Sequence, residues 1–344
     1  MSARARRRAV ALAIAALAPA TLAATDEPLY VKNLSPVTGL LGLPSQRSAD
    51  TPGPGEFLFE AHGSLANTYV NEFRQPEFVN LDGEVARLAL ALRYGFGENW
   101  DVAVELPWLQ HSGGHLDSLI DGWHELFGMS DGGRDAVDRD LLDYRYSGPD
   151  AAFEFADDSS GVGDVSVALN HVFYRRDATA VSVVAGYKFG TGDSDDFTGS
   201  GEGDAFLALR FSGDHLASLP LTWHGQVGYL RAGEIEALGD LQNRDLWFAG
   251  LAVDWAVWDR VSLLAQVDGH AGPTDSGLTG IGEDAWMLSA GLRWRLSPRW
   301  QLDFSFVEDI QVETAPDIIF QASLRWRPHG AGRAQRLTST TRRP

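Results

Sequence analysis

Alternation of apolar and polar residues with a period of two is the feature that most constrains how this chain folds. It recurs in twelve consecutive segments, each about as long as a strand that crosses a membrane in a barrel. Because successive strand residues point to opposite faces, each segment predicts a strand with one apolar and one wet face. The segments are 57–66, 84–94, 100–109, 165–173, 181–189, 205–211, 221–229, 247–257, 261–267, 286–296, 300–306 and 318–326.

The positions of tryptophan and of charged residues indicate which solvent each face meets. Most of the eleven Trp residues fall on the apolar face near strand ends, for example Trp100 and Trp294. Such rings form interface girdles in membrane barrels, whereas a soluble sandwich would gather them in its core. The opposite face is too rich in charge for a sandwich core but suits a hydrated lumen. We therefore predict an all-β fold, a closed antiparallel transmembrane β-barrel of about 12 strands, with a soluble all-β protein as the alternative.

The first residues predict export. Arg4, Arg6, Arg7 and Arg8 precede an apolar stretch and the small residues around Ala23. This pattern is typical of a secretory signal peptide over residues 1–24, and the stretch is too short for a spanning helix. The chain contains no cysteine, so no disulfide framework is expected.

Net charge argues against a nucleic-acid-binding protein, and hydropathy argues against a protein that crosses the membrane with helices. The formal net charge of −19 repels nucleic acid, so that partner class is set aside. No later segment has the ~20 uninterrupted apolar residues of a membrane helix, and only a barrel then remains for crossing a bilayer. The expected partners are outer-membrane lipid, lipopolysaccharide and the barrel-assembly machinery, while the oligomeric state stays open.

The connections between the predicted strands alternate in length. Segments such as 95–99 and 297–299 are tight, whereas 67–81, 112–161 and 191–203 are long. Short turns belong to the periplasmic side of such barrels and long loops to the outside. We expect a protein of the cell outer membrane with both termini in the periplasm.

Several short motifs occur along the chain: Asp82-Gly83-Glu84, Glu105-Leu106-Pro107, Gly113-Gly114-His115-Leu116-Asp117, Gly161-Val162-Gly163-Asp164, Glu308-Asp309 and Ala315-Pro316-Asp317. Together they resemble those of an uncharacterised family of Gram-negative outer-membrane β-barrel proteins, a domain of unknown function. The similarity covers roughly residues 28–327. It implies a signal peptide and a barrel and carries no implied activity. The basic tail after Trp326 departs from barrels that end on an aromatic residue.

The largest connection predicts one short amphipathic helix in an external loop. Its apolar residues recur at helical spacing and form a single stripe. The stripe is consistent with a gate at the barrel mouth, and equally with a loop helix that only covers strand ends. The gate candidates are Leu116, Leu119, Ile120, Trp123 and Phe127.

Neither a metal site nor a catalytic site is predicted. His111, His115 and His124 lie near acids in the large loop, but acidic helices commonly show such spacing by chance. The acidic, glycine-rich stretch 191–204 matches no EF-hand pattern. A membrane-embedded lipid hydrolase needs an oriented Ser–His pair, and no G-x-S-x-G motif is present. We therefore expect no enzyme activity and no cofactor.

The expected function is passive passage of a small solute or an apolar molecule through the barrel. A structural or surface-interaction barrel with a plugged lumen is the main alternative, and a lipid hydrolase is the third. Four parts are expected: a signal peptide (1–24), an N-terminal segment that fills the lumen or lies on the periplasmic rim (25–55), the barrel (56–327) and a disordered basic tail (328–344). The lumen-lining candidates are Arg87, Arg93, Glu105, Asp204, Arg210 and Arg293.

Overall fold

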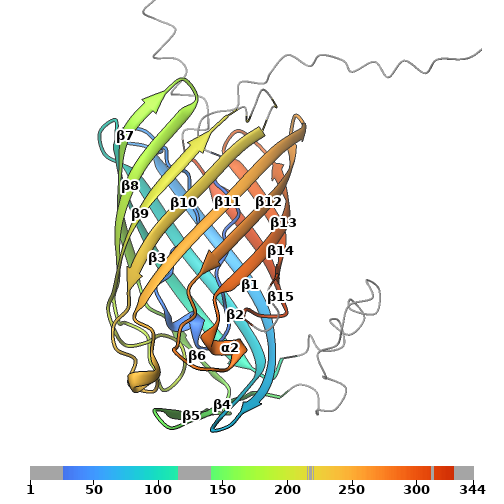
Figure 1. The fold of residues 1–344 in the computed structure, drawn as a ribbon. Coiled ribbons are helices and arrows are strands. Elements are labelled where there is room, and N and C mark those ends of the chain that lie inside the picture. The colour runs from blue at the N-terminus through green and yellow to red at the C-terminus, as the bar shows by residue number, and fades with distance from the viewer. Residues whose placement is uncertain are drawn as a thin grey trace, which may run out of the picture.

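Twelve long antiparallel strands form a closed barrel in the computed structural model, which describes residues 26–114, 141–214, 216, 219, 221–310 and 314–328 (Figure 1). The barrel closes because β1 pairs with both β2 and β15. The predicted fold class is confirmed. The barrel strands are β1 (Phe57–Arg74), β2 (Glu77–Gly95), β3 (Trp100–Ser112), β7 (Ser166–Arg176), β8 (Thr179–Lys188), β9 (Asp204–Gly213), β10 (Leu221–Arg231), β11 (Asp245–Trp258), β12 (Val261–His270), β13 (Ala285–Arg295), β14 (Trp300–Asp309) and β15 (Ile318–Trp326).

Smaller elements lie in the connections. Strands β4 (Asp143–Ser147) and β5 (Ala152–Phe155) form a hairpin that pairs with the outer part of β2, while β6 (Ser159–Val162) pairs with β3. Three short helical turns complete the described elements: the 3₁₀ helices η1 (Thr38–Leu40) and η3 (Gly239–Leu241), and α2 (Thr279–Gly282). No helix in these ranges is long and apolar enough to cross a membrane.

The outer face of the barrel is apolar, as the alternating pattern predicts. Leu251 on β11 is 69% exposed, and Trp255 and Trp294 also face outward near strand ends. A large apolar side chain gains nothing from water, so an outward band of this kind is stable only against lipid. The inward residues of the same strands are polar and buried, such as Asp254 and Arg293.

The first hairpin corrects one expected boundary. The stretch 67–81 was expected to be a loop, but β1 and β2 continue through it and pair residue by residue up to Arg74 and Glu77. The pairing persists because inward side chains of the extension, including Val70 and Val79, pack in the main apolar cluster. Burial of these side chains offsets the cost of extending the two strands beyond the band of lipid.

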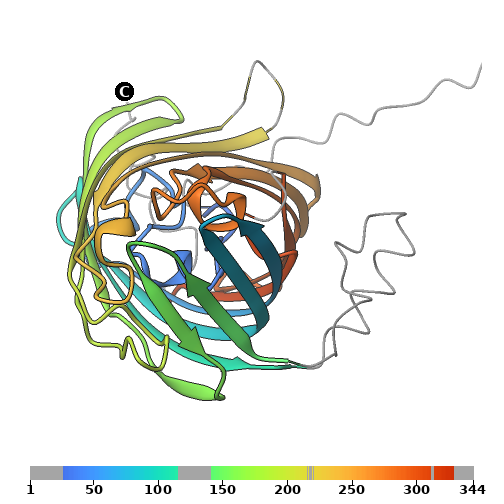
Figure 2. The same cartoon turned by 60° about the horizontal axis from the view of Figure 1, so that its bottom comes forward.

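The two ends of the barrel differ. At one end, which we call the turn end, the strands are joined by short connections such as 177–178 and 259–260, and both ends of the described chain lie there. At the other end, which we call the loop end, lie the β4–β5 hairpin, α2 and the longer connections (Figure 1). Residues 26–56 lie inside the ring of strands, as the view from the loop end shows (Figure 2).

Candidate functional site

The interior of the barrel is the candidate site, and its main occupant is the segment of residues 26–56. This segment rises from the turn end to η1 near the loop end and then doubles back. Two hydrogen bonds join the rising and descending halves: Ser45 Oγ donates to the carbonyl of Val31 (2.7 Å), and Lys32 Nζ donates to that of Leu43 (2.6 Å). The segment forms no strand, so side chains of the barrel wall satisfy much of its backbone.

Ion pairs tie the segment to the wall in an alternating chain. Arg47 of the segment pairs with Glu60, and Glu60 also receives Arg325 Nε at 2.8 Å. Arg325 pairs with Asp303, which also accepts Arg293 Nη2 at 3.0 Å.

The chain then continues around the wall and returns to the segment. Arg293 bridges to Asp254, which lies 3.9 Å from Arg295, and Arg295 pairs with Asp26 of the segment. Buried charges are tolerated only when paired in this way. The network therefore holds both halves of the segment against β1, β11 and β13–β15.

Five of the six lumen-lining candidates take part in such pairs. Arg87 donates to Glu105 (2.8 Å), and the hydroxyl of Tyr30 in the segment donates to the same carboxylate (2.9 Å). Arg93 Nε donates to Asp101 (2.5 Å).

The same arginine, Arg93, reaches the segment as well, since its Nη1 donates to Glu27 at 2.9 Å. Asp204 lies 3.2 Å from Lys188 Nζ and accepts the backbone N–H of Gly42 (2.6 Å). The wall approaches Gly42 so closely that a Cβ there would lie 3.0 Å from both Asp204 and Lys188, which only glycine avoids. Arg293 belongs to the alternating chain above.

The sixth candidate, Arg210 on β9, is buried inside the barrel like the others but differs in its surroundings. Within the described residues its guanidinium forms no ion pair, and its Nε has no hydrogen-bond partner.

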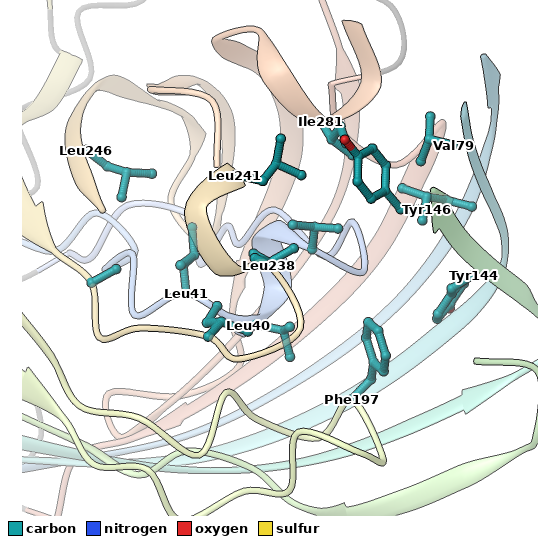
Figure 3. Packing of buried hydrophobic residues seen from close by; sticks show 14 of the residues in the cluster. Leu40, Leu41, Val79, Tyr144, Tyr146, Phe197, Leu238, Leu241, Leu246 and Ile281 are labelled. Atoms are coloured by element: carbon teal, nitrogen blue, oxygen red, sulfur yellow. The ribbon is translucent and has the colours of Figure 1, made fainter. Parts of the chain in front are cut away.

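An apolar cluster packs across the loop end and forms what we call the cap (Figure 3). Its side chains come from the segment in and next to η1, from the connections between strands, from the β4–β5 hairpin and from the loop-end parts of β2 and β11. Burial raises the pKa of Tyr144 in β4, so its hydroxyl stays protonated within the cap. The labelled members are Leu40, Leu41, Val79, Tyr144, Tyr146, Phe197, Leu238, Leu241, Leu246 and Ile281.

The cap residues were missed at the sequence level. The expected gate helix, with Leu116, Leu119, Ile120, Trp123 and Phe127, lies outside the described residues. A signal for the cap was available, because apolar residues such as Phe197 and Leu238 interrupt otherwise polar connections. Their partners could not be foreseen, since they come from segments far apart in the chain.

Two Ser–His pairs lie inside the barrel and bear on the hydrolase alternative. Ser323 Oγ lies 2.8 Å from Nδ1 of His62, and Ser212 Oγ lies 2.8 Å from Nδ1 of His224. The imidazole of His62 is fully buried and stacks on the ring of Tyr30, with 3.9 Å between the two ring centroids. Neither pair faces the lipid side, where a membrane-embedded hydrolase would meet its substrate.

The described part of the chain shows no group of three or more His, Asp or Glu residues placed to hold a metal ion. His111 is buried among aromatic rings and its Nε2 lies 2.9 Å from the carbonyl of Phe197. Such an environment suits a structural histidine. His115 and His124 lie outside the described residues.

A family model described as "Protein of unknown function (DUF3187)" matches residues 8–327. The chain belongs to this family. The resemblance stated from the sequence motifs is thereby confirmed, and DUF3187 carries no activity with it. A comparison of the sequence with curated proteins finds no match.

Solved structures of outer-membrane barrels align with this DUF3187 protein. The COG4313 outer membrane channel from Pseudomonas putida F1 aligns with a TM-score of 0.50 at 15% identity, over 81% of this chain and 97% of that one. The NanC porin aligns with a TM-score of 0.46 at 9% identity, over 78% and 97% of the two chains. The likeness to the COG4313 channel shows that the chain has the fold of an outer-membrane β-barrel.

Proposed function

We propose that this protein is an outer-membrane channel for small solutes whose lumen is closed, in the conformation described here, by its own N-terminal segment and cap. The observation that supports this function is a series of three small cavities between the segment and the barrel wall. An interior built only for rigidity would be packed without such voids.

The cavities follow the segment along the barrel. A cavity of about 120 Å³ at the turn end is lined by Asp50, Arg175 and His224, among others. One of about 50 Å³ lies beside Arg47 and Arg210.

The third cavity, of about 70 Å³, is bordered by Lys188 and His270 below the cap. Each exceeds the roughly 10–15 Å³ that one water molecule requires. Displacement of the segment would join the three into one hydrated path.

The nature of the contacts favours a segment that can move. It contributes no strand to the sheet. Leu29, Val31 and Leu34 pack in an apolar cluster with the wall below the cap, while many of its other contacts there are ion pairs and hydrogen bonds. Water can replace such contacts far more readily than it can replace a packed apolar core. The charged wall residues that the segment now pairs with would then line a wet lumen. Twelve strands give a lumen between the filled eight-stranded barrels and the open sixteen-stranded porins.

We also propose an orientation for the barrel in the outer membrane. Short turns typically face the periplasm, so the turn end and both termini would lie there, with the cap facing outward toward lipopolysaccharide. The enclosed Ser–His pairs favour a structural role for these residues, and we propose no enzyme activity.

A closed structural barrel is the second candidate, and the cap favours it. The cap joins η1 to three connections through buried leucine, isoleucine and aromatic side chains, each of which stabilises the closed form by about 1.5–3 kcal/mol. In this case the loop end would serve only as an external binding surface.

A disulfide that ties the segment to the barrel wall, and that can be reduced again, distinguishes the channel from the closed structural barrel. The backbone N–H of Ala49 donates to Ser212 Oγ at 2.8 Å. This contact places the two backbones within reach of a cysteine pair, whose Cα atoms lie roughly 4.4–6.8 Å apart. Because the chain has no other cysteine, the variant Ala49→Cys/Ser212→Cys can form only this intramolecular bond.

Planar-bilayer conductance of the refolded double variant is the measurement. We expect discrete openings under reducing conditions and their loss on oxidation, while the single variant Ser212→Cys is insensitive to redox state. Silence in every form, including wild type, would refute the channel and favour the closed barrel. Equal currents in the oxidised and reduced forms would show that the segment is not the gate.

A further inference from the structure

Among the buried arginines of the described lumen, Arg210 differs from its neighbours because it forms no ion pair. It is 3% exposed, and the structure gives its guanidinium no carboxylate partner among the described residues. By contrast, Arg93 is held by two acids and Arg293 by two more. A buried charge without a partner is unstable, so a ligand of opposite charge would be bound favourably.

The register of the sheet explains why Arg210 is left unpaired. Its direct neighbours are Ser182 on β8 and Gln226 on β10, both uncharged. The acids on the same side of the lumen, Glu27 and Asp101, are already engaged by Arg93. Neither acid forms an ion pair with Arg210 in this structure.

A cavity borders Arg210 and is large enough for a small ion. Its volume is about 50 Å³, several times the roughly 10–15 Å³ that one water molecule needs. Cations outnumber acids in its lining: Lys32, Arg47, Arg93 and Arg210 against Asp101 and Glu105.

A second unused group lies next to Arg210. Ser182, directly opposite it in the β8–β9 ladder, is fully buried, and its hydroxyl has no hydrogen-bond partner among the described residues. Residues directly opposite in an antiparallel pair point to the same face, so this hydroxyl and the guanidinium face the same part of the lumen. A hydroxyl and a guanidinium are both donors, and donors recognise anions.

We propose that Arg210, at the cavity that it borders, forms a binding site for a small monovalent anion inside the barrel, with the unpartnered hydroxyl of Ser182 as its cross-strand neighbour. A halide ion has the charge and the size that the cavity accepts. The role of the site in selecting permeant anions rests on the proposed channel function, whereas binding itself does not. The site lies beside the descending half of the segment, where a permeating ion would pass.

Bromide binding tests the site without any current. The thermal unfolding midpoint of the full chain is measured in detergent, in sodium gluconate and in increasing sodium bromide at constant ionic strength. A ligand that binds only the folded state raises this midpoint. We expect bromide to raise the unfolding midpoint of the wild type. The unfolding midpoint of Arg210→Met should not change with bromide.

Two controls keep this test specific. Arg176→Met makes the same substitution at a residue whose side chain is 77% exposed at the turn end, and it should respond to bromide as wild type does. In gluconate alone, Arg210→Met should be at least as stable as wild type, because it removes an unpaired buried charge. An equal response to bromide in Arg210→Met and wild type would overturn the site, as would no response in wild type.

Ion selectivity then tests the link to transport. Reversal potentials under a salt gradient should indicate anion preference for wild type and a several-fold lower anion-to-cation permeability ratio for Arg210→Met. Bromide binding in a protein that never conducts would leave the site intact and refute the channel. Conductance without any effect of bromide or of Arg210 would refute the site and leave the channel.

Discussion

Removal of Arg293 tests whether the interior is dry and paired or already hydrated. Its side chain is fully buried, and it holds Asp254 and Asp303 while Nη2 donates to the carbonyl of Glu27. In Arg293→Met, Asp303 keeps Arg325. Asp254 keeps a hydrogen bond with Ser262, but its one remaining cation among the described residues is Arg295 at 3.9 Å. The variant thus leaves a buried carboxylate nearly unpaired.

The expected cost follows from that unpaired charge. Breaking a buried ion pair by removing one partner costs about 3–5 kcal/mol, so we expect a fall of this size in the free energy of unfolding. The added change Asp254→Asn removes the orphaned charge and should recover part of the loss. Urea unfolding of the barrel refolded into lipid vesicles, followed by tryptophan fluorescence, measures both effects.

A matched control uses an exposed pair of the same chemistry. Arg231 pairs with Asp245, and their side chains are 50% and 55% exposed. Exposed pairs contribute only about 0–1 kcal/mol, so Arg231→Met should have little effect. If Arg293→Met costs no more than Arg231→Met, the interior is hydrated and the argument from buried pairing is wrong.

Two further predictions concern the lipid face and the cap. Leu251→Arg places a charge in the middle of the outward band and should lower the free energy of unfolding in vesicles by about 2–4 kcal/mol. The control variant Leu251→Phe should not lower it. Equal effects of the two substitutions would mean that this face does not meet lipid. The pKa of Tyr144 is raised by burial above its ordinary 10.0, so the unfolded chain loses this proton first and stability falls as pH rises above about 10. Titration of the unfolding free energy should show a shallower alkaline decline for Tyr144→Phe, and an unchanged decline would contradict the burial of this hydroxyl.

Much of the barrel could be predicted from local pattern. Within each strand, residues that face lipid are apolar and residues that face the lumen are polar. The two kinds alternate because successive strand residues point to opposite faces of the sheet. Leu251 and Asp254 illustrate this: one is apolar and faces outward, the other is charged and faces inward. The boundary at residues 67–81 failed because the strands continue past the lipid, where pairing with β4 and packing in the cap maintain them.

The occupancy of the lumen could not be predicted in the same way. The apolar segment around Leu29 and Val31 was compatible with the lumen or the rim, and contacts across more than two hundred residues decide its position. The cap likewise joins Leu40, Phe197 and Leu241, which no local pattern connects.

The sequence by itself determined the fold class, the number of barrel strands and which residues of each strand face inward. These properties depend on a period of two within single strands. Only the tertiary structure decided which inward charges are paired, because pairing depends on register between strands and on the path of residues 26–56. Arg210 and Arg293 look alike in sequence, both inward arginines on long strands. Arg210 lies opposite a serine and a glutamine, whereas Arg293 lies opposite an aspartate. This difference in neighbours makes Arg210 a candidate ligand site and Arg293 part of a structural ion pair.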